Sequence, residues 1–207
     1  MSKIIGLIAV MLAVAGGAAA QSSSDLPPGV FKGGNTLADA VPGTYTIDPD
    51  HCAVIARVQH IGYSWSVFRF DRAGGKLTWD PAAPEKSTLA AAVETGSIAS
   101  NVKGFATDLA GEEFLRSATI PEATFVSSAF RRTDATHGKV DGQFTLMGST
   151  KPLTFDVELV GVGKGWADKP RIGVHAVAKI KPQDYGFPAL FGNAIEIVVD
   201  AEFERAP

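Results

Sequence analysis

Histidines are the first residues to consider as metal ligands, and the chain contains four of them. His51 and His60 fall in one predicted strand, but their odd separation points the two side chains to opposite faces. His137 lies in a polar turn, where we expect it to be solvated. His175 lies in a predicted strand, where we expect a hydrogen-bonded histidine in the core. The sequence therefore predicts no metal site and no cofactor.

Nucleophilic chemistry has one weak candidate, the Ser-x-x-Lys spacing of Ser100 and Lys103. Penicillin-binding enzymes place such a pair on one helical turn, but they also need Ser-Asp-Asn and Lys-Thr-Gly motifs that this chain lacks. The carboxylate pairs Asp48 with Asp50 and Glu112 with Glu113 fit a turn and a helix surface better than an acid and base pair. We predict no catalytic residues and no enzyme, and keep a hydrolase with a site assembled from distant residues as an open alternative.

The remaining reactive group is Cys52, the only cysteine, which cannot form a disulfide within the chain. No neighbour in sequence would lower its pKa, so we interpret it as a small buried hydrophobic residue. The formal net charge of −3 argues against a nucleic-acid partner.

Alternation of apolar and polar residues dominates the chain after Gly43. Leu153 to Leu159 is the clearest case, because every second residue is apolar and the residues between are polar or charged. The same pattern predicts a series of strands, each with one buried and one solvated face. These predicted strands are Thr44–Ile47, Cys52–His60, Ser66–Asp71, Gly75–Trp79, Ser87–Glu94, Ala123–Phe130, Gly138–Met147, Leu153–Val160, Arg171–Ile180 and Ala194–Phe203.

One segment departs from alternation. Asn101–Arg116 has apolar residues near helical spacing and predicts a single helical crossover, which Pro121 separates from the next strand. The rest is an all-β chain of about eight strands, which can close on itself and remove its exposed edges. At that size the interior is either filled by side chains or wide enough for one small ligand.

The N-terminus carries signals of its own. Residues 1–20 combine Lys3, an apolar run and Ala18-Ala19-Ala20, which predicts a signal peptide cleaved before Gln21 and a periplasmic location. Residues 21–43 are rich in Ser, Pro and Gly and predict a flexible lead-in. Residues 44–205 then form one domain.

Five ordered motifs resemble the YceI-like, polyisoprenoid-binding family. They span nearly all of the predicted domain, and their order is more specific than any one motif. They are Tyr45–His51, His60–Gly62 with Phe70 and Gly75–Leu77, Asp108–Ser127, Val140–Leu153 and Asp184–Phe187.

This resemblance implies a lipocalin-like extended antiparallel β-barrel with a long apolar pocket. It also implies a lipid-like guest, such as an isoprenoid or a fatty-acid derivative, held for storage or transport in the periplasm, and a homodimer. The residues expected to face inward and bind the guest are Val54, Ala56, Val58, His60, Phe68, Phe70, Leu77, Leu89, Phe125, Leu146, Phe155, Val157, Ile172 and Val174. For each of them, filling a solid core remains an equal interpretation, and His60 serves either a polar head group or a structural hydrogen bond.

The chain departs from the family pattern at two positions of the predicted strand Cys52–His60. Cys52 stands where the family usually has serine, and Ala56 stands where phenylalanine is frequent. The smaller Ala56 predicts a locally wider cavity. The alternative function is an accessory protein of envelope stress or electron transport, acting through protein contacts in which Tyr63 and Trp65 take part or guard the pocket mouth.

Overall fold

The computed structural model describes residues 26–27, 30–189 and 192–206, and β-strands make up most of this part. The strands are β1 (Gly43–His60), β2 (Ser64–Phe70), β3 (Ala73–Trp79), β4 (Thr88–Glu94), β5 (Ile98–Ala99), β6 (Glu122–Arg132), β7 (His137–Leu146), β8 (Ser149–Lys164), β9 (Pro170–Ile180) and β10 (Ile195–Arg205). The helical elements are α1 (Phe105–Ala110) and the short 3₁₀ turns η2 (Leu37–Asp39), η3 (Pro84–Lys86), η4 (Thr95–Ser97), η5 (Trp166–Asp168) and η6 (Pro182–Tyr185).

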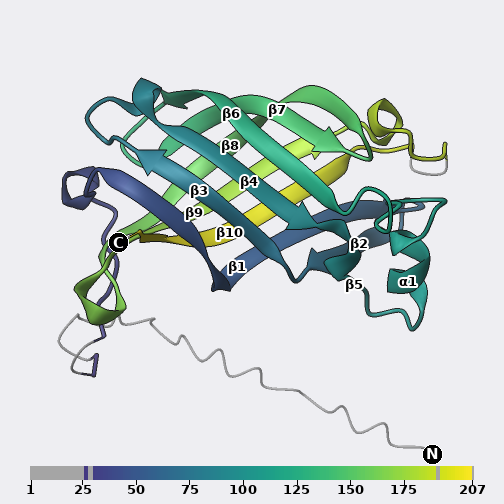
Figure 1. Cartoon of the computed structure of the whole chain (residues 1–207), viewed down its shortest axis with the longest axis horizontal. Helices are drawn as coiled ribbons and strands as arrows, with labels where there is room; N and C mark the ends of the chain where they lie inside the picture. Colours follow the sequence, from purple (N-terminus) through teal and green to yellow (C-terminus); the bar gives the residue numbers. More distant parts are fainter. Residues whose placement is uncertain (1–25, 28–29, 190–191, 207) are drawn as a thin grey trace, which may run out of the picture.

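The sheet closes on itself, as the alternating pattern predicts. Its order is β1, β3, β4, β6, β7, β8, β9 and β10, and β10 pairs with β1 again, so eight antiparallel strands form a barrel. Figure 1 shows these strands crossing the long axis of the molecule. The short β5 and the strand β2 extend the sheet from the second half of β1 and lie outside the closed ring.

Strand β1 joins two segments that the sequence predicts as separate strands. The pairing with β10 shifts between Ile47 and Cys52, so residues 48–51 lie opposite the single residue Glu202. This bulge changes the phase of the strand. Ile47 and Cys52 both line the interior, although one is at an odd position and the other at an even one.

Helix α1 is much shorter than the predicted helix over Asn101–Arg116. Gly104, with φ of 83°, precedes it, and Gly111 caps its end. Turns occupy most of the rest of the predicted range, and Arg116 at its end has a positive φ of 53° that an α-helix cannot contain. The helix covers one end of the barrel, where Phe105 packs on Phe68 with ring centroids 5.9 Å apart.

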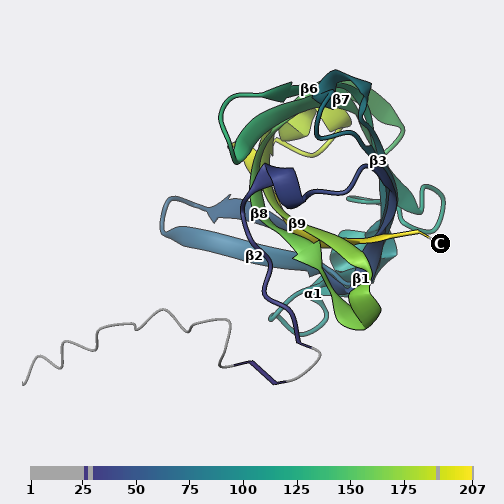
Figure 2. The ribbon, with the colours of Figure 1, turned by 90° about the vertical axis from the view of Figure 1, so that its left-hand side faces the viewer.

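The segment of residues 30–42, which we call the N-terminal strap, passes over the opposite end (Figure 2). Gly34 and Val162 of β8 exchange backbone hydrogen bonds of 2.9 Å and 2.7 Å, and Ala40 is buried. The second half of the predicted lead-in therefore packs on the barrel. Residues 1–20, the predicted signal peptide, lie outside the described residues.

Two groups of buried side chains occupy the barrel. One is centred on β6, β7 and η6 and includes the edge-to-face pair Phe125 and Phe155, with centroids 5.1 Å apart. The other gathers around Tyr45 at the strap end, where the phenol donates a 2.6 Å hydrogen bond to the Val41 carbonyl. Among the described residues, no helix has the length and apolar character that a membrane crossing requires.

Candidate functional site: an apolar cavity inside the barrel

A cavity of about 300 Å³ runs through the barrel between these two groups of side chains. Leu109 and Leu115, from α1 and the turn after it, border one end, and Leu37 of the strap borders the other. Exposed residues of the β6–β7 turn, among them Arg132 and His137, also border it, so the cavity reaches the surface there. The interior is therefore partly hollow. The alternation of residues alone does not decide between a hollow and a filled interior.

The walls come from the inward faces of all eight barrel strands and from β2. Thirteen of the predicted inward residues border the cavity. They are Val54, Ala56, Val58, Phe68, Phe70, Leu77, Leu89, Phe125, Leu146, Phe155, Val157, Ile172 and Val174.

His60 is the exception, and its predicted inward position is wrong. Its side chain is exposed and does not border the cavity. The reason is that β1 leaves the barrel before this point, since its last pair with β10 joins Arg57 to Glu196. His60 instead belongs to a hairpin that projects from the wall.

The structure adds lining residues that the prediction missed. The largest set lies on β10, whose strict alternation already placed these residues on one face without assigning that face to the interior. These are Ile195, Ile197, Val199, Ala201 and Phe203. Leu37 could not be found in this way, because it follows no strand pattern.

Two polar groups near the strap end lack a partner in the described part of the chain. Trp79 borders the cavity at the end of β3, and its indole Nε1 is buried without a hydrogen bond. Arg132 borders the mouth, and its side chain forms no hydrogen bond or ion pair with a described residue. An unpaired buried donor is costly, so the Trp79 N–H is a group that a guest's acceptor would satisfy.

Cys52 also borders the cavity, and it is half-buried. Burial, followed by the charges of Asp200 and Asp48, raises the pKa of the thiol. Cys52 is therefore mainly protonated at neutral pH and behaves as the small apolar wall residue that the sequence predicts.

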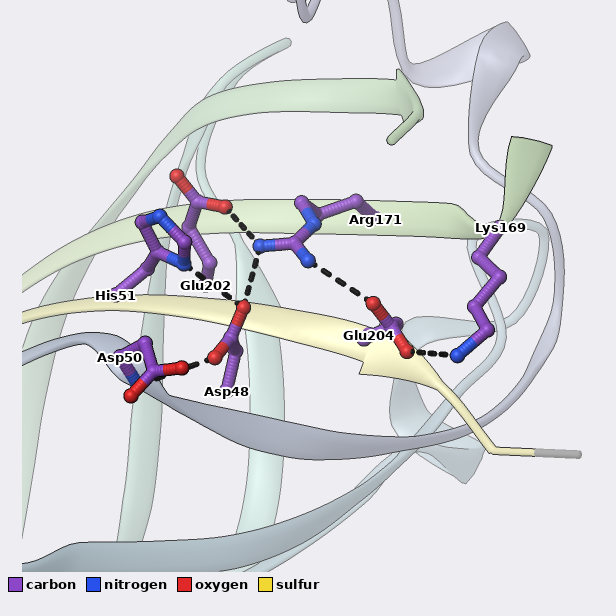
Figure 3. Close-up of polar contacts among 7 residues, drawn as sticks. All are labelled: Asp48, Asp50, His51, Lys169, Arg171, Glu202 and Glu204. Carbon is purple, nitrogen blue, oxygen red and sulfur yellow. Dashed lines mark hydrogen bonds and ion pairs between the residues drawn. The ribbon is translucent and has the colours of Figure 1, made fainter. Parts of the chain in front are cut away.

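On the outside of the barrel, charged residues gather at the β1 bulge (Figure 3). Arg171 of β9 donates hydrogen bonds of 2.7 Å to Asp48, 2.5 Å to Glu202 and 2.9 Å to Glu204. His51 Nδ1 lies 2.9 Å from Asp48 Oδ2. We call these five residues the bulge network.

Burial would raise the pKa of Asp48, but hydrogen bonds from His51, Arg171 and the Asp50 N–H hold it below its usual value. The hydrogen bond between His51 and Asp48 also raises the pKa of His51. Asp48, His51 and Glu202 carry potential metal ligands close to one another, a grouping that sequence spacing missed because Glu202 comes from the last strand. Arg171 already pairs with both carboxylates, so we interpret the group as an ion-pair network.

Of the other chemically suggestive residues, Ser100, Lys103 and His175 lie apart from the cavity, whereas His137 borders its mouth. Ser100 and Lys103 lie in the turn before α1, where the Ser100 hydroxyl accepts a hydrogen bond from the Val102 N–H. His175 is not in the core as predicted, because it faces outward, with Nδ1 2.7 Å from Asp200 Oδ1. His137 lies in its turn beside Asp134, at 3.0 Å.

Comparison with known families gives a match to the YceI-like domain over residues 45–203. Proteins called YceI from Salmonella arizonae and Salmonella paratyphi B are both 33% identical over 173 residues, which cover 81% of this chain and 90% of theirs. The matched region is the barrel described above.

Solved structures give the same fold. BcnA of Burkholderia cenocepacia has a TM-score of 0.66 at 20% identity, over 75% of this chain and 98% of its own. The Campylobacter jejuni YceI protein has a TM-score of 0.65 at 24% identity, over 72% and 91%. A polyisoprenoid binding domain from Saccharophagus degradans, implicated in plant cell wall breakdown, has a TM-score of 0.54 at 16% identity, over 79% and 98%.

Proposed function

Because the chain belongs to the family of YceI-like domains, we propose that its barrel holds a lipid-like guest, such as a polyisoprenoid or a fatty-acid derivative, for storage or transport. The observation that carries the proposal is the apolar cavity of about 300 Å³, to which every barrel strand contributes side chains. The polyisoprenoid binding domain of Saccharophagus degradans, which shares the fold, supports this class of guest.

The apolar wall is sufficient to bind such a guest without a covalent bond. Burial of apolar surface contributes roughly 25 cal/mol per Å², so enclosing about 500 Å² of a chain gives about 12 kcal/mol. Association costs at least about 4 kcal/mol of this, which leaves roughly 8 kcal/mol and a micromolar dissociation constant.

An amphiphilic guest would place its polar end near the strap. The free N–H of Trp79 and the unpaired Arg132 both border that end of the cavity. The opposite end is bordered by the apolar Leu109 and Leu115. The guest's tail therefore points toward α1 and its head toward the β6–β7 turn.

The proposal includes a periplasmic location, reached by export with residues 1–20 as the signal, and a homodimer. Cell fractionation and mass measurement in solution test these two parts separately. We also propose that the protein holds its guest without transforming it. The Thr136 hydroxyl lies 3.1 Å from His137 Nδ1 at the border of the cavity, but this pair belongs to the β6–β7 turn at the surface and not to the apolar wall that would enclose the guest.

The single cysteine provides a direct test of guest binding. Cys52 borders the cavity, so its rate of alkylation by a small maleimide should fall several-fold when a polyprenyl lipid is added. As a control, Cys52→Ser combined with Val160→Cys moves the thiol to an exposed position on the wall, where the lipid should have no effect. An unchanged rate at Cys52 over a range of polyprenyl and fatty-acyl lipids would overturn the proposal and favour a function through protein contacts.

A further inference from the structure

The hairpin that joins β1 to β2 extends beyond the barrel. The last pairing of β1 with β10 is at Arg57, and the pairing of β2 with β5 is confined to Arg69 and Phe70. In the described part of the chain, the strand residues between these limits pair only with each other. Figure 2 shows this two-stranded ribbon projecting sideways from the wall. Val58 and Phe68 still border the cavity, and we call residues 59–67, which lie beyond them, the hairpin tip.

The hairpin tip exposes large apolar side chains. The exposed fractions are 74% for Ile61, 88% for Tyr63, 46% for Trp65 and 50% for Val67. Ile61 and Gly62 have positive φ values of 52° and 80°, and the Tyr63 N–H donates a 2.9 Å hydrogen bond to the His60 carbonyl. The turn is therefore a tight, defined loop that holds Ile61 and Tyr63 in water.

The charges around the tip have one sign. From Ile55 to Phe70 the sequence has no Asp or Glu, and it has Arg57, His60 and Arg69, although the whole chain is acidic. The Arg57 guanidinium lies 5.0 Å from the centre of the Trp65 ring. At the base of the hairpin, Arg57 also pairs with Glu196, and Arg69 pairs with Asp71. Apolar contact is therefore the main contribution that the tip itself offers to binding.

We propose that the hairpin tip docks on a lipid bilayer and inserts Ile61, Tyr63 and Trp65 into the headgroup region. Aromatic side chains with a polar end favour this region, and flanking arginines favour anionic headgroups. The convex tip fits a deformable surface, whereas a two-fold contact with a second copy needs a self-complementary face on both. The backbone N–H and C=O groups on the unpaired outer edges of the hairpin stay hydrated in the headgroup region, so they need no protein partner.

Docking goes beyond the proposed function, because it concerns where the barrel meets lipid and not what the cavity holds. Membrane docking can be absent while guest binding persists, and guest binding can be absent while docking persists. The two proposals therefore need separate readouts.

The test places an environment-sensitive nitrobenzoxadiazole label on one cysteine in a Cys52→Ser background. Tyr63→Cys labels the hairpin tip, and Thr133→Cys labels the exposed β6–β7 turn as a matched control. With vesicles of phosphatidylethanolamine and phosphatidylglycerol, emission from position 63 should rise at least about three-fold, shift to the blue and be quenched by brominated lipids, while position 133 stays unchanged. All proteins are prepared in the same way, so the N-terminal residues contribute equally.

A second measurement avoids the label. Ile61→Ser with Tyr63→Ser should weaken vesicle co-sedimentation about ten-fold, and Val126→Ser with Val160→Ser, which removes exposed apolar groups from the barrel wall, should not. No emission change at position 63, or an equal change at both positions, overturns the proposal. Loss of self-association in the tip variant without loss of vesicle binding would assign the tip to a second copy.

Discussion

Ala56 is the lining residue at which the sequence predicts a locally wider cavity. It pairs with Phe68 of β2 on one side and with Ile197 of β10 on the other, and all three border the cavity. We expect the methyl group between two large side chains to leave a recess in the wall. On the proposed function, the size of residue 56 would then limit how far a long guest extends past this point.

Ala56→Phe fills this recess and should shorten the longest polyprenyl chain that binds, while short chains keep their affinity within about three-fold. A competition assay over a chain-length series measures the change. Ala53→Phe is the matched control, because Ala53 lies on the same strand but does not border the cavity. An unchanged length limit in Ala56→Phe would contradict the recess.

Trp79→Phe removes the unpaired indole N–H and keeps an aromatic ring on the wall. We expect affinity for a guest with an acceptor head to fall about five-fold, because one hydrogen bond contributes about 1 kcal/mol. Affinity for a plain hydrocarbon of the same length should stay the same. Equal losses for both guests would show that Trp79 acts through packing alone.

At the scale of elements, the bulge in β1 lets one strand face the cavity with odd-numbered residues before the bulge and mainly with even-numbered residues after it. Residues 48–51 oppose Glu202 alone, and Arg171 holds Asp48 and Glu202 together across this irregularity. The Arg171 side chain is only 19% exposed, so its ion pairs are screened less than those at the surface. The bulge network therefore stabilises the point where β1 changes phase.

Arg171→Met should lower the free energy of unfolding by about 1–3 kcal/mol at neutral pH, because three carboxylates are left without their shared cation. The folded pKa of Asp48 is lowered, so its contribution is present above its unfolded pKa and is lost as the pH falls through the folded value. The deficit should therefore shrink below about pH 4.

Urea unfolding at neutral and acidic pH measures this change. Arg69→Met, which removes an exposed pair with Asp71, should leave the free energy of unfolding unchanged within measurement error at either pH. A deficit in Arg171→Met that is independent of pH would show that the side chain acts by packing and not by charge.

The strands were predictable to the extent that one face of each is buried. Alternation identified Leu153 to Leu159 and the β10 face, and it detected the phase change at Asp48 as a break between two strands. It could not show that β1 continues through the break, since Arg171 and Glu202 come from distant strands. The helix was predicted too long because apolar spacing counts Phe114 and Leu115, which instead lie in turns.

The sequence could not predict which residues at the ends of the barrel strands reach the cavity in the folded chain. His60 has the phase of Val54 and Val58 but lies beyond the point where β1 leaves the barrel. Leu37 reaches the cavity only because Gly34 pairs with Val162, and no local pattern predicts such a contact. Lining residues inside the ring follow from periodicity, whereas those at its two ends depend on how the strap and α1 cover them.

At the scale of the whole molecule, closure of eight strands removes the edges of the sheet and encloses a hollow interior. The strap covers one end, α1 covers the other, and the hairpin tip extends outward from the wall (Figures 1 and 2). This arrangement separates the proposed site for a guest from the proposed surface for docking. The cavity, rather than any catalytic group, is the central feature of the account.

Native mass spectrometry of the protein, recovered gently from the cells that make it, tests this claim most directly. We predict a population one lipid heavier than the bare chain, which dissociates to release a long-chain isoprenoid or fatty-acid derivative, and in Ala56→Phe a shift of that population toward shorter chains. Only the bare mass, persisting after incubation with polyprenyl and fatty-acyl lipids, would contradict the account.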